Sequence, residues 1–248
     1  MTPHGRLPRG KGKYSETAEK GFAELDAMVT DVEREVRAWR GWQLLENPSR
    51  HTDLRLVLRE ILHAVPMYQG QTTEAGFRMI GRLHKSEVRL MQVLSHHKAE
   101  EAEHGLWAWD DYLAMGGNPA LQCAAPTPAA FAVAAVWDRM ADRCDPFGYI
   151  GAEYLFENLT ERLTKAIAAS PGAGIAFANG TRFLSDHVTE DVRHANLFRH
   201  LIKQVLTERP DAIGPMTQCL SLFRQVYPIP LRDEALVRAI GAPAGDAA

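Results

Sequence analysis

One pattern of metal-binding residue types occurs twice in this chain with the same spacing, and it restricts the folds that can use it. The pattern is histidine, acid and histidine at intervals of four and then three residues, and its copies are His97, Glu101, His104 and His187, Asp191, His194. Residues four and seven positions apart return to one face of an α-helix. Each copy therefore directs two imidazoles and a carboxylate the same way. A fold that uses both copies for one site must place two helices face to face.

Apolar residues recur at helical spacing along almost the whole chain, and no stretch alternates apolar and polar residues long enough to form a sheet. The sequence therefore predicts an all-α protein. Glycine and proline clusters, with capping residues before prolines, mark the predicted helix boundaries. The predicted helices cover about 15–45, 52–66, 73–115 with a break near Gly81 left open, 127–143, 145–169, 181–207 and 212–227, and 170–174 is a predicted loop.

Length and composition are those of a single globular domain. With 248 residues and 46% hydrophobic content the chain can bury one substantial core, and no change of composition indicates a second domain. We predict a disordered basic tail over 1–14, a helical metal-binding domain over 15–227 and a weakly structured C-terminal tail over 228–248.

Charge and hydropathy argue against several partners and compartments. The formal net charge of −3 gives no general attraction to nucleic acid or anionic lipid. The N-terminal stretch lacks the apolar core of a signal peptide, and no later apolar run approaches the roughly 20 residues that span a bilayer. We therefore expect a cytoplasmic protein that binds neither nucleic acid nor a membrane.

The other motifs of the chain do not indicate a second kind of catalytic or binding site. Three cysteines, Cys123, Cys144 and Cys219, have no CxxC spacing, which predicts reduced thiols and neither a disulfide framework nor a zinc site. No phosphate-binding loop and no Gly-x-Ser-x-Gly motif occurs. Among the acids near the first histidine pattern, we expect Glu100 and Glu103 in solvent or beside the site, and Asp110 and Asp111 in an exposed patch.

A third predicted helix adds two acids, Glu153 and Glu157, in apolar surroundings. A carboxylate there has little reason to be buried unless it meets a cation. Imidazole nitrogens and carboxylate oxygens suit a transition metal without any thiolate. Solvated positions on amphipathic helices would explain any one of these matches. Two copies of one register, with an acid on an intervening helix, favour metal binding.

Three segments resemble, in order and approximate spacing, the helices of the haem-oxygenase-like diiron oxidases and oxygenases. They are AEEAEHGLWAWDDYLAMGG, GYIGAEYLFE and FLSDHVTEDVRHANLFRHL, and the resemblance covers about 87–206. Gly151, Tyr154 and Glu157 are similar to the family's Gly-x-x-Tyr-x-x-Glu, and the second histidine pattern is similar to its His-x-x-x-Asp-x-x-His. The resemblance implies iron ligands at Glu101, His104, Glu157, His187, Asp191 and His194.

His97 departs from the family pattern. Many members place their first carboxylate seven residues before the histidine, which is the position of His97 in this chain. The resemblance then implies that Glu101, three residues before His104, is the ligand, as in some members. His97 is left open as a further ligand or as a neighbour of the site.

The resemblance also implies a fold and an activity. The fold is a single-domain haem-oxygenase-like helical bundle, and the activity is that of a non-haem diiron oxidoreductase with two Fe²⁺ ions and O2 as co-substrate. An amino-acid-like or fatty-acid-like small molecule is the implied substrate, with desaturation, C–C fragmentation or N-oxygenation as the outcome. An electron donor and a second copy of the chain are further candidate partners. Arg182 and Arg193 are candidate anchors for a substrate carboxylate, with exposed helix charges as the simpler interpretation.

Two alternatives stay open. A ferritin-like four-helix bundle, which binds or oxidises iron, would use the same acid–histidine pairs and would need a further acid from Glu60 or Glu74. A metal-free hydrolase of the haem-oxygenase-like fold would need a nucleophile such as a cysteine. Cys123 follows a glycine-rich helix end and is not expected on a helix that faces the site.

Overall fold

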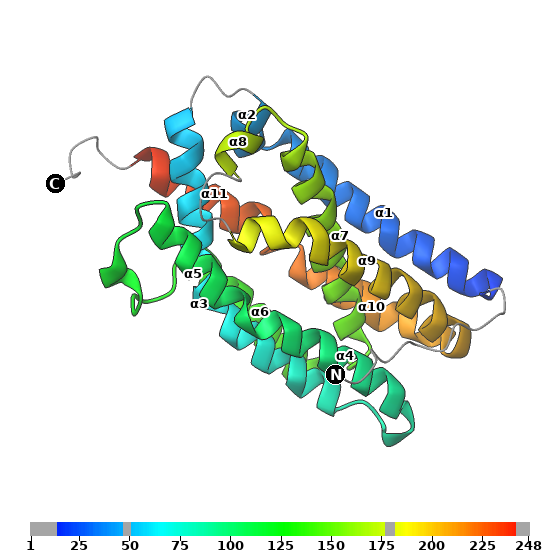
Figure 1. The fold of residues 1–248 in the computed structure, drawn as a ribbon. Coiled ribbons are helices and arrows are strands. Elements are labelled where there is room, and N and C mark those ends of the chain that lie inside the picture. The colour runs from blue at the N-terminus through cyan, green and yellow to red at the C-terminus, as the bar shows by residue number, and fades with distance from the viewer. Residues whose placement is uncertain (1–13, 47–50, 177–181, 242–248) are drawn as a thin grey trace.

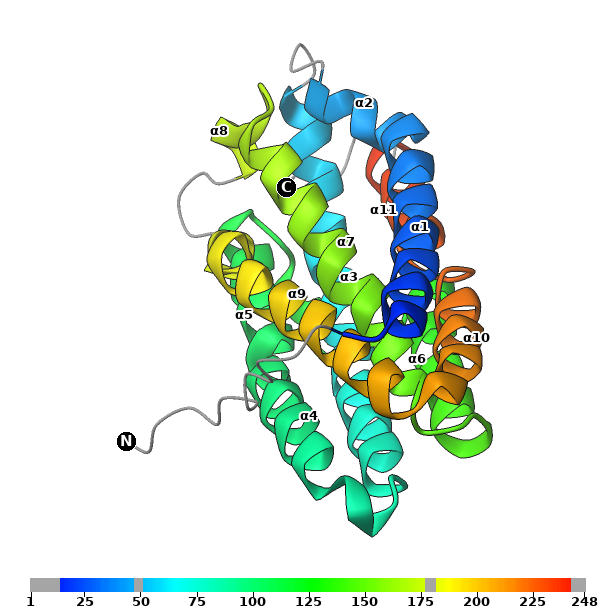
Figure 2. The same cartoon turned by 90° about the vertical axis from the view of Figure 1, so that its right-hand side faces the viewer.

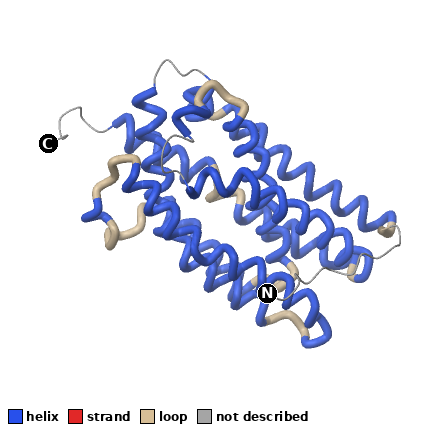
Figure 3. The backbone as a smooth tube through the Cα atoms, viewed as in Figure 1, coloured by secondary structure: helices blue, strands red, loops and turns tan. Residues whose placement is uncertain are grey.

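The computed structural model describes residues 14–46, 51–176 and 182–241. Within these ranges the regular structure is helical and no strand occurs, as Figure 3 shows, so the all-α prediction is confirmed. The basic tail predicted over 1–14 lies outside the described residues, apart from residue 14. Among the described helices, none combines the length and the apolar character needed to cross a bilayer.

The helices, labelled in Figure 1, form an elongated bundle. The α-helices are α1 (Glu16–Ala38), α2 (Arg40–Glu46), α3 (His51–Gly81), α4 (Val88–Glu100), α5 (His104–Ala114), α6 (Pro128–Arg143), α7 (Gly148–Ala168), α8 (Ala173–Ala176), α9 (Arg182–Glu208), α10 (Ile213–Phe223) and α11 (Ile229–Gly241). The 3-10 turns are η2 (Lys85–Glu87), η3 (Glu101–Glu103), η4 (Pro119–Leu121) and η5 (Pro210–Ala212).

Two sets of packed helices enclose the core. On one side α3 packs against α5, α6 and α11, and on the other α7 packs against α9 and α10 while α1 covers α7 and α9. Contacts of α5 with α9 join the two sets. Figure 2 shows α9 crossing α7 obliquely, with α4 and α5 along one side of the bundle. This arrangement brings the two histidine patterns, on α4 to α5 and on α9, to the same region as α7.

Several helix boundaries differ from the prediction. The helix expected to end near residue 66 continues through Pro66 as α3. An internal proline costs a helix about 3 kcal/mol, but burial of Ala64, Val65 and Tyr68 around it offsets this cost. The break that the prediction left open near Gly81 is present, because α3 ends at Gly81 and α4 begins at Val88, and the helix predicted over 73–115 is divided among α3, α4 and α5.

The ends of the described chain also differ. The helix expected over 15–45 is interrupted at Trp39, whose ψ of 141° is extended. Residues 229–241, expected to be weakly structured, form α11, which buries Leu231, Ala235 and Leu236. A helix this short is stabilised mainly by the surface against which it packs, here α3. That contact is not visible in local sequence.

Candidate metal centre

The candidate ligands lie where α4 to α5, α7 and α9 meet, and all of them are buried. No residue in the set is more than 6% exposed, and the set is His97, Glu101, His104, Glu157, His187, Asp191 and His194. Burying seven histidines and acids together is costly unless they pair with each other or with a cation. The alternative that these are solvated helix positions does not hold.

Four of these residues converge most closely. His97, Glu101, Glu157 and His194 each offer one ligand atom, and these atoms all lie within 4.8 Å of one another. His97 Nε2 lies 2.9 Å from Glu157 Oε1. His194 Nδ1 lies 3.2 Å from Glu101 Oε1 and 3.4 Å from Glu157 Oε2. Two nitrogens and two oxygens so placed can hold one transition-metal ion.

The other three implied ligands lie beside this group without joining it. His104 Nδ1 is 2.7 Å from Glu101 Oε2, and the rings of His104 and His187 are 4.6 Å apart between centroids. The Nδ1 of His187 contacts the backbone carbonyl of Phe183, one turn earlier in α9, which leaves Nε2 for another partner. The Asp191 carboxyl lies close enough to Glu157 and Glu101 for their negative charges to raise its pKa. His97, which the resemblance left open, is therefore a member of the converging group.

Unpaired polar atoms test whether this set suits a metal. Four buried atoms of this set make no hydrogen bond with any described residue: His97 Nδ1, Asp191 Oδ2, and Glu101 Oε1 and His194 Nδ1, which lie 3.2 Å apart without hydrogen-bond geometry. Each buried polar atom without a partner costs about 1–3 kcal/mol. A cation would satisfy both the oxygens and the nitrogens, so the donor set fits a bound metal ion.

The pKa values of the group are shifted by burial and by the charges packed together in it. Burial, reinforced by Glu157 and Glu101, raises the pKa of Asp191 to about 9. Burial alone would lower the pKa of His194, but its contacts with Glu101 and Glu157 raise it to about 11. Burial and Glu101 would raise the pKa of Glu157, yet His97 and His194 hold it at about 2. Protons on Asp191 and His194 thus take the place that a metal cation would fill.

The Gly-x-x-Tyr-x-x-Glu segment directs α7 toward three different neighbours. A Cβ on Gly151 would lie 2.1 Å from the backbone oxygen of Met216, so only glycine allows this approach of α10. The Tyr154 hydroxyl donates to Asp26 Oδ1 on α1 at 2.7 Å. Glu157 reaches the metal centre. The motif therefore fixes the position of α7 as well as supplying a carboxylate.

A buried ion pair adjoins the centre, and one of its members was not identified from sequence. Lys98 Nζ lies 2.5 Å from Glu153 Oε1, and both side chains are almost fully buried. The ammonium lies 5.5 Å from the Trp137 ring centroid and 5.8 Å from that of Tyr149. Lysine is rarely buried, so sequence alone gives Lys98 no signal beyond its place next to His97.

Asp111 corrects another expectation, because it is buried rather than part of an exposed patch. One of its oxygens accepts the backbone N–H of Arg182 at 2.7 Å and the other accepts that of Phe183 at 2.8 Å. These are N–H groups of the first turn of α9, which have no partner within the helix. The neighbouring Asp110 is exposed, as expected. A carboxylate on α5 thus fixes the start of the helix that carries the second histidine pattern.

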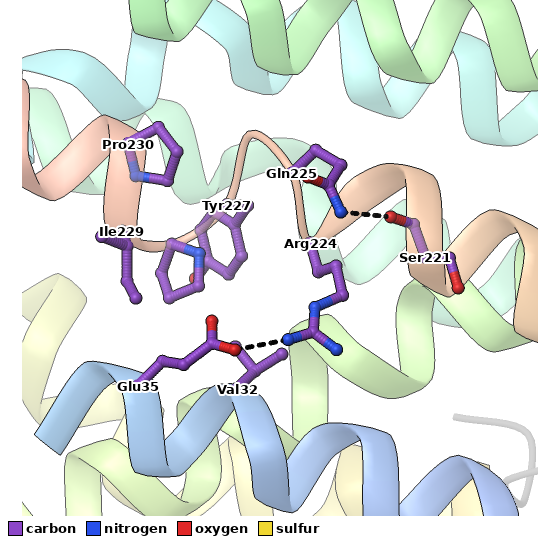
Figure 4. A pocket seen from close by; sticks show the side chains of 9 residues that line it. Val32, Glu35, Ser221, Arg224, Gln225, Tyr227, Ile229 and Pro230 are labelled. Atoms are coloured by element: carbon purple, nitrogen blue, oxygen red, sulfur yellow. Dashed lines mark hydrogen bonds and ion pairs between the residues drawn. The ribbon is translucent and has the colours of Figure 1, made fainter. Parts of the chain in front are cut away.

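A separate cavity of about 460 Å³ lies between α1 and the turn from α10 to α11. Figure 4 shows Glu35 and Arg224, paired at 2.6 Å, on its wall with Tyr227. None of its lining residues is a candidate metal ligand. This cavity is therefore not part of the centre.

Comparison with known proteins identifies the fold. No protein-family model and no curated protein matches the chain. The structure is similar to the crystal structure of a domain of unknown function with a heme oxygenase-like fold from Shewanella denitrificans OS217, with a TM-score of 0.64 and 17% sequence identity over 91% of this chain and 94% of that chain. At that identity the likeness shows the fold alone, and the predicted haem-oxygenase-like fold is confirmed.

The donors that a ferritin-like site would need are incomplete. Glu74 is largely exposed and lies 3.9 Å from Arg78. Glu60 pairs with Arg59 and Arg238. Neither acid lies among the converging ligands, so α3 supplies no carboxylate to the centre.

Proposed function

We propose that this protein is an O2-dependent non-haem diiron oxidase or oxygenase that acts on a small amino-acid-like or fatty-acid-like substrate and receives electrons from a separate donor. The observation that carries this proposal is the buried convergence of His97, Glu101, Glu157 and His194. His104, His187 and Asp191, packed beside them, supply enough further donors for a second ion. Nitrogen and oxygen donors without thiolate are typical of non-haem iron sites.

The two acids of the converging group differ in the histidines that their oxygens face. Glu101 faces His104 with one oxygen and His194 with the other. Glu157 faces His97 with one oxygen and His194 with the other. A carboxylate whose oxygens face the donors of two different ions would bridge them. Glu101 would fill that role, because His104 lies outside the converging group, whereas both histidines that Glu157 faces belong to it.

Bound iron would supply the reduction of O2 to an oxidant able to attack an unactivated bond of the substrate. The protein's part is to orient the ligands and to exclude water. Aromatic rings cover three of the histidines, and the pairs, with distances between ring centroids, are His97 and Phe198 at 4.9 Å, His104 and Trp107 at 4.9 Å, and His187 and Phe183 at 4.2 Å. Such a site protects a reactive oxidant from solvent.

The hydrolase alternative has less support. Cys123 is exposed, and Cys144 and Cys219 are buried; none of the three belongs to the converging group. Burial, with the neighbouring Cys144, raises the pKa of the Cys219 thiol, which makes it a poor nucleophile. No cysteine is therefore placed to replace the metal chemistry.

The test begins with metal content. Protein reconstituted with Fe(II) without oxygen is expected to hold close to two irons per chain by elemental analysis. Glu157→Gln is expected to lower this number, whereas Glu103→Gln, a variant of an exposed acid on η3, is not. Absence of bound iron in the wild-type protein would overturn the proposal.

The second step separates an enzyme from an iron-storage protein. The Fe(II)-loaded protein is mixed with O2 in a stopped-flow instrument, with and without panels of amino acids and medium-chain fatty acids. One compound is expected to accelerate O2 consumption and to be converted into an oxidised product in proportion, because an enzyme gains from forming its oxidant only beside the substrate. If no compound changes the kinetics, and repeated Fe(II) additions are oxidised and retained as ferric mineral, the protein stores iron.

A further inference from the structure

His194 uses its two ring nitrogens on opposite sides. Nδ1 faces the interior, 3.2 Å from Glu101 Oε1 and 3.4 Å from Glu157 Oε2. Nε2 faces outward and lies 3.2 Å from Glu100 Oε2. The His194 side chain is 2% exposed and that of Glu100 is 30% exposed. The imidazole therefore spans the wall between the metal centre and the surface, and Glu100 covers its outer end.

Arg193 holds Glu100 in this place. Arg193 Nη2 donates to Glu100 Oε2 at 3.0 Å and to Glu190 Oε2 at 2.7 Å. The same Nη2 lies 3.0 Å from His194 Nε2, and both nitrogens lie within 3.2 Å of Glu100 Oε2. A guanidinium nitrogen is only a donor, and Glu100 accepts from it and from a protonated Nε2 alike. The carboxylate is thus fixed against the ring rather than free in solvent.

The other candidate ligand histidine of α9, His187, is oriented in the opposite sense. The Nδ1 of His187 contacts the carbonyl of Phe183 in its own helix, so its Nε2 is left for the centre. In His194 the interior nitrogen is Nδ1, and the outer nitrogen contacts Glu100 on α4. A metal-bound histidine needs a lone pair on the binding nitrogen and commonly donates its other N–H to a carboxylate or carbonyl. The acceptors that the outer nitrogens contact are the Phe183 carbonyl of α9 for His187 and the Glu100 carboxylate of α4 for His194.

We propose that Glu100 is a positioning residue, which keeps the Nε2 proton of His194 and thereby presents Nδ1 of that ring to the metal. The inference rests on the proposed metal function and adds to it the nitrogen by which His194 binds. Glu100 itself touches no metal. It acts across the boundary between α4 and α9, so it also couples the two helices that carry the histidine patterns.

The test uses a control that shares the same arginine. Glu100→Ala removes the acceptor, and Glu100→Gln keeps a neutral one. Glu190→Ala removes a carboxylate that pairs with Arg193 and not with His194 in the described part of the chain. Co(II) is titrated into each apoprotein without oxygen and followed by its visible ligand-field bands. Glu100→Ala is expected to lose about 10- to 100-fold in Co(II) affinity with altered bands. Glu100→Gln should recover part of that loss, and Glu190→Ala should match the wild type.

Each outcome has a distinct meaning. If wild-type protein binds neither Co(II) nor Fe(II), the proposed function fails together with this inference. If wild-type protein binds Co(II) and Glu100→Ala has the same affinity and spectrum, this inference alone is overturned. An equal loss in Glu190→Ala would assign the effect to Arg193 and would also overturn it. Circular dichroism of each apoprotein shows whether the variant is folded, and Glu100→Gln retains the shape of the side chain should Glu100→Ala fail to fold.

Discussion

His97 is the residue at which this chain departs from the family it resembles. Its Nε2 lies 2.9 Å from Glu157, and its ligand atom belongs to the group within 4.8 Å. We expect His97→Ala to lower metal binding about as much as His194→Ala, since alanine cannot replace a nitrogen ligand. Metal content after anaerobic reconstitution measures this.

The neighbouring His96 is the matched control for that prediction. Its side chain is 63% exposed and lies 3.3 Å from Glu100. His96→Ala should leave metal content unchanged. If His97→Ala keeps the wild-type metal content while His194→Ala loses it, His97 is a neighbour of the centre, and the six ligands implied by the resemblance are the complete set.

At the residue scale, Lys98 and Glu153 form an ion pair that is buried beside the candidate metal centre. Lys98→Met would leave the Glu153 carboxylate buried without its partner, which typically costs about 3–5 kcal/mol. We expect a loss of that size in the free energy of unfolding of the apoprotein, measured with denaturant.

Two further variants make this prediction specific. Adding Glu153→Leu to Lys98→Met should restore most of the stability, because two apolar side chains can replace a buried ion pair. Lys165→Met removes a lysine that is 56% exposed, and its buried partner Glu161 keeps an ion pair with Arg199, so this variant should lose much less stability than Lys98→Met. A Lys98→Met variant as stable as Lys165→Met would show that the pair contributes little.

At the scale of elements, Asp111 determines where α9 begins. Its two bonds to the first turn of α9 place His187 at a fixed distance along that helix. Asp111→Ala should cost about 0.5–2 kcal/mol, as loss of a helix cap does. It should also increase amide hydrogen exchange in the first turns of α9. Asp110→Ala, on the exposed side of α5, is the control. Unchanged exchange in Asp111→Ala would show that other contacts hold the helix start.

The elements also show what sequence can and cannot predict. The start of α6 at Pro128 is predictable, because the Thr127 side chain accepts the N–H of Ala130 and proline suits the first turn. The passage of α3 through Pro66 is not, because burial of neighbouring residues outweighs the local cost. Local sequence signals are sufficient where a helix is stabilised by its own residues. They fail where contacts with a helix distant in sequence determine the structure.

The same distinction applies to the candidate centre. Helical spacing placed His187, Asp191 and His194 on one face, and the structure has all three buried. Which of them converge depends on the relative placement of α4, α7 and α9, which spacing cannot specify. The partner of Lys98 and the N–H groups that donate to Asp111 lie on other helices for the same reason. Sequence thus indicates which residues belong to a centre, while packing decides which atoms meet.

For the molecule as a whole, the centre joins helices that are far apart in sequence. Glu101 and His97 come from the α4 to α5 region, Glu157 from α7 and His194 from α9. A metal that binds all of them binds only the folded chain with full affinity. Metal binding must therefore stabilise the fold, by an amount that grows with metal concentration.

The dependence of this stabilisation on pH follows from two protonated groups. Asp191 has its pKa raised from 3.8 to about 9, so the folded apoprotein holds a proton that the unfolded chain has lost, and its stability falls as pH rises between these values. His194 has its pKa raised from 6.5 to about 11, so the stability that it contributes is complete below 6.5 and is lost as pH rises through 11. Both groups predict an apoprotein that becomes less stable from about pH 7 to about pH 9.

A bound metal should oppose this trend, because metal binding displaces the protons on Asp191 and His194. Competition from protons for these ligands weakens as pH rises, so the metal binds more tightly. We expect the increase in Tm on adding Co(II) to grow from about pH 7 to about pH 9, while the Tm of the apoprotein declines over the same range. Thermal unfolding followed by circular dichroism, with and without Co(II), measures both trends. His194→Ala should remove most of the increase. An apoprotein whose Tm is flat or rises over this range would show that Asp191 and His194 do not hold the protons assigned to them.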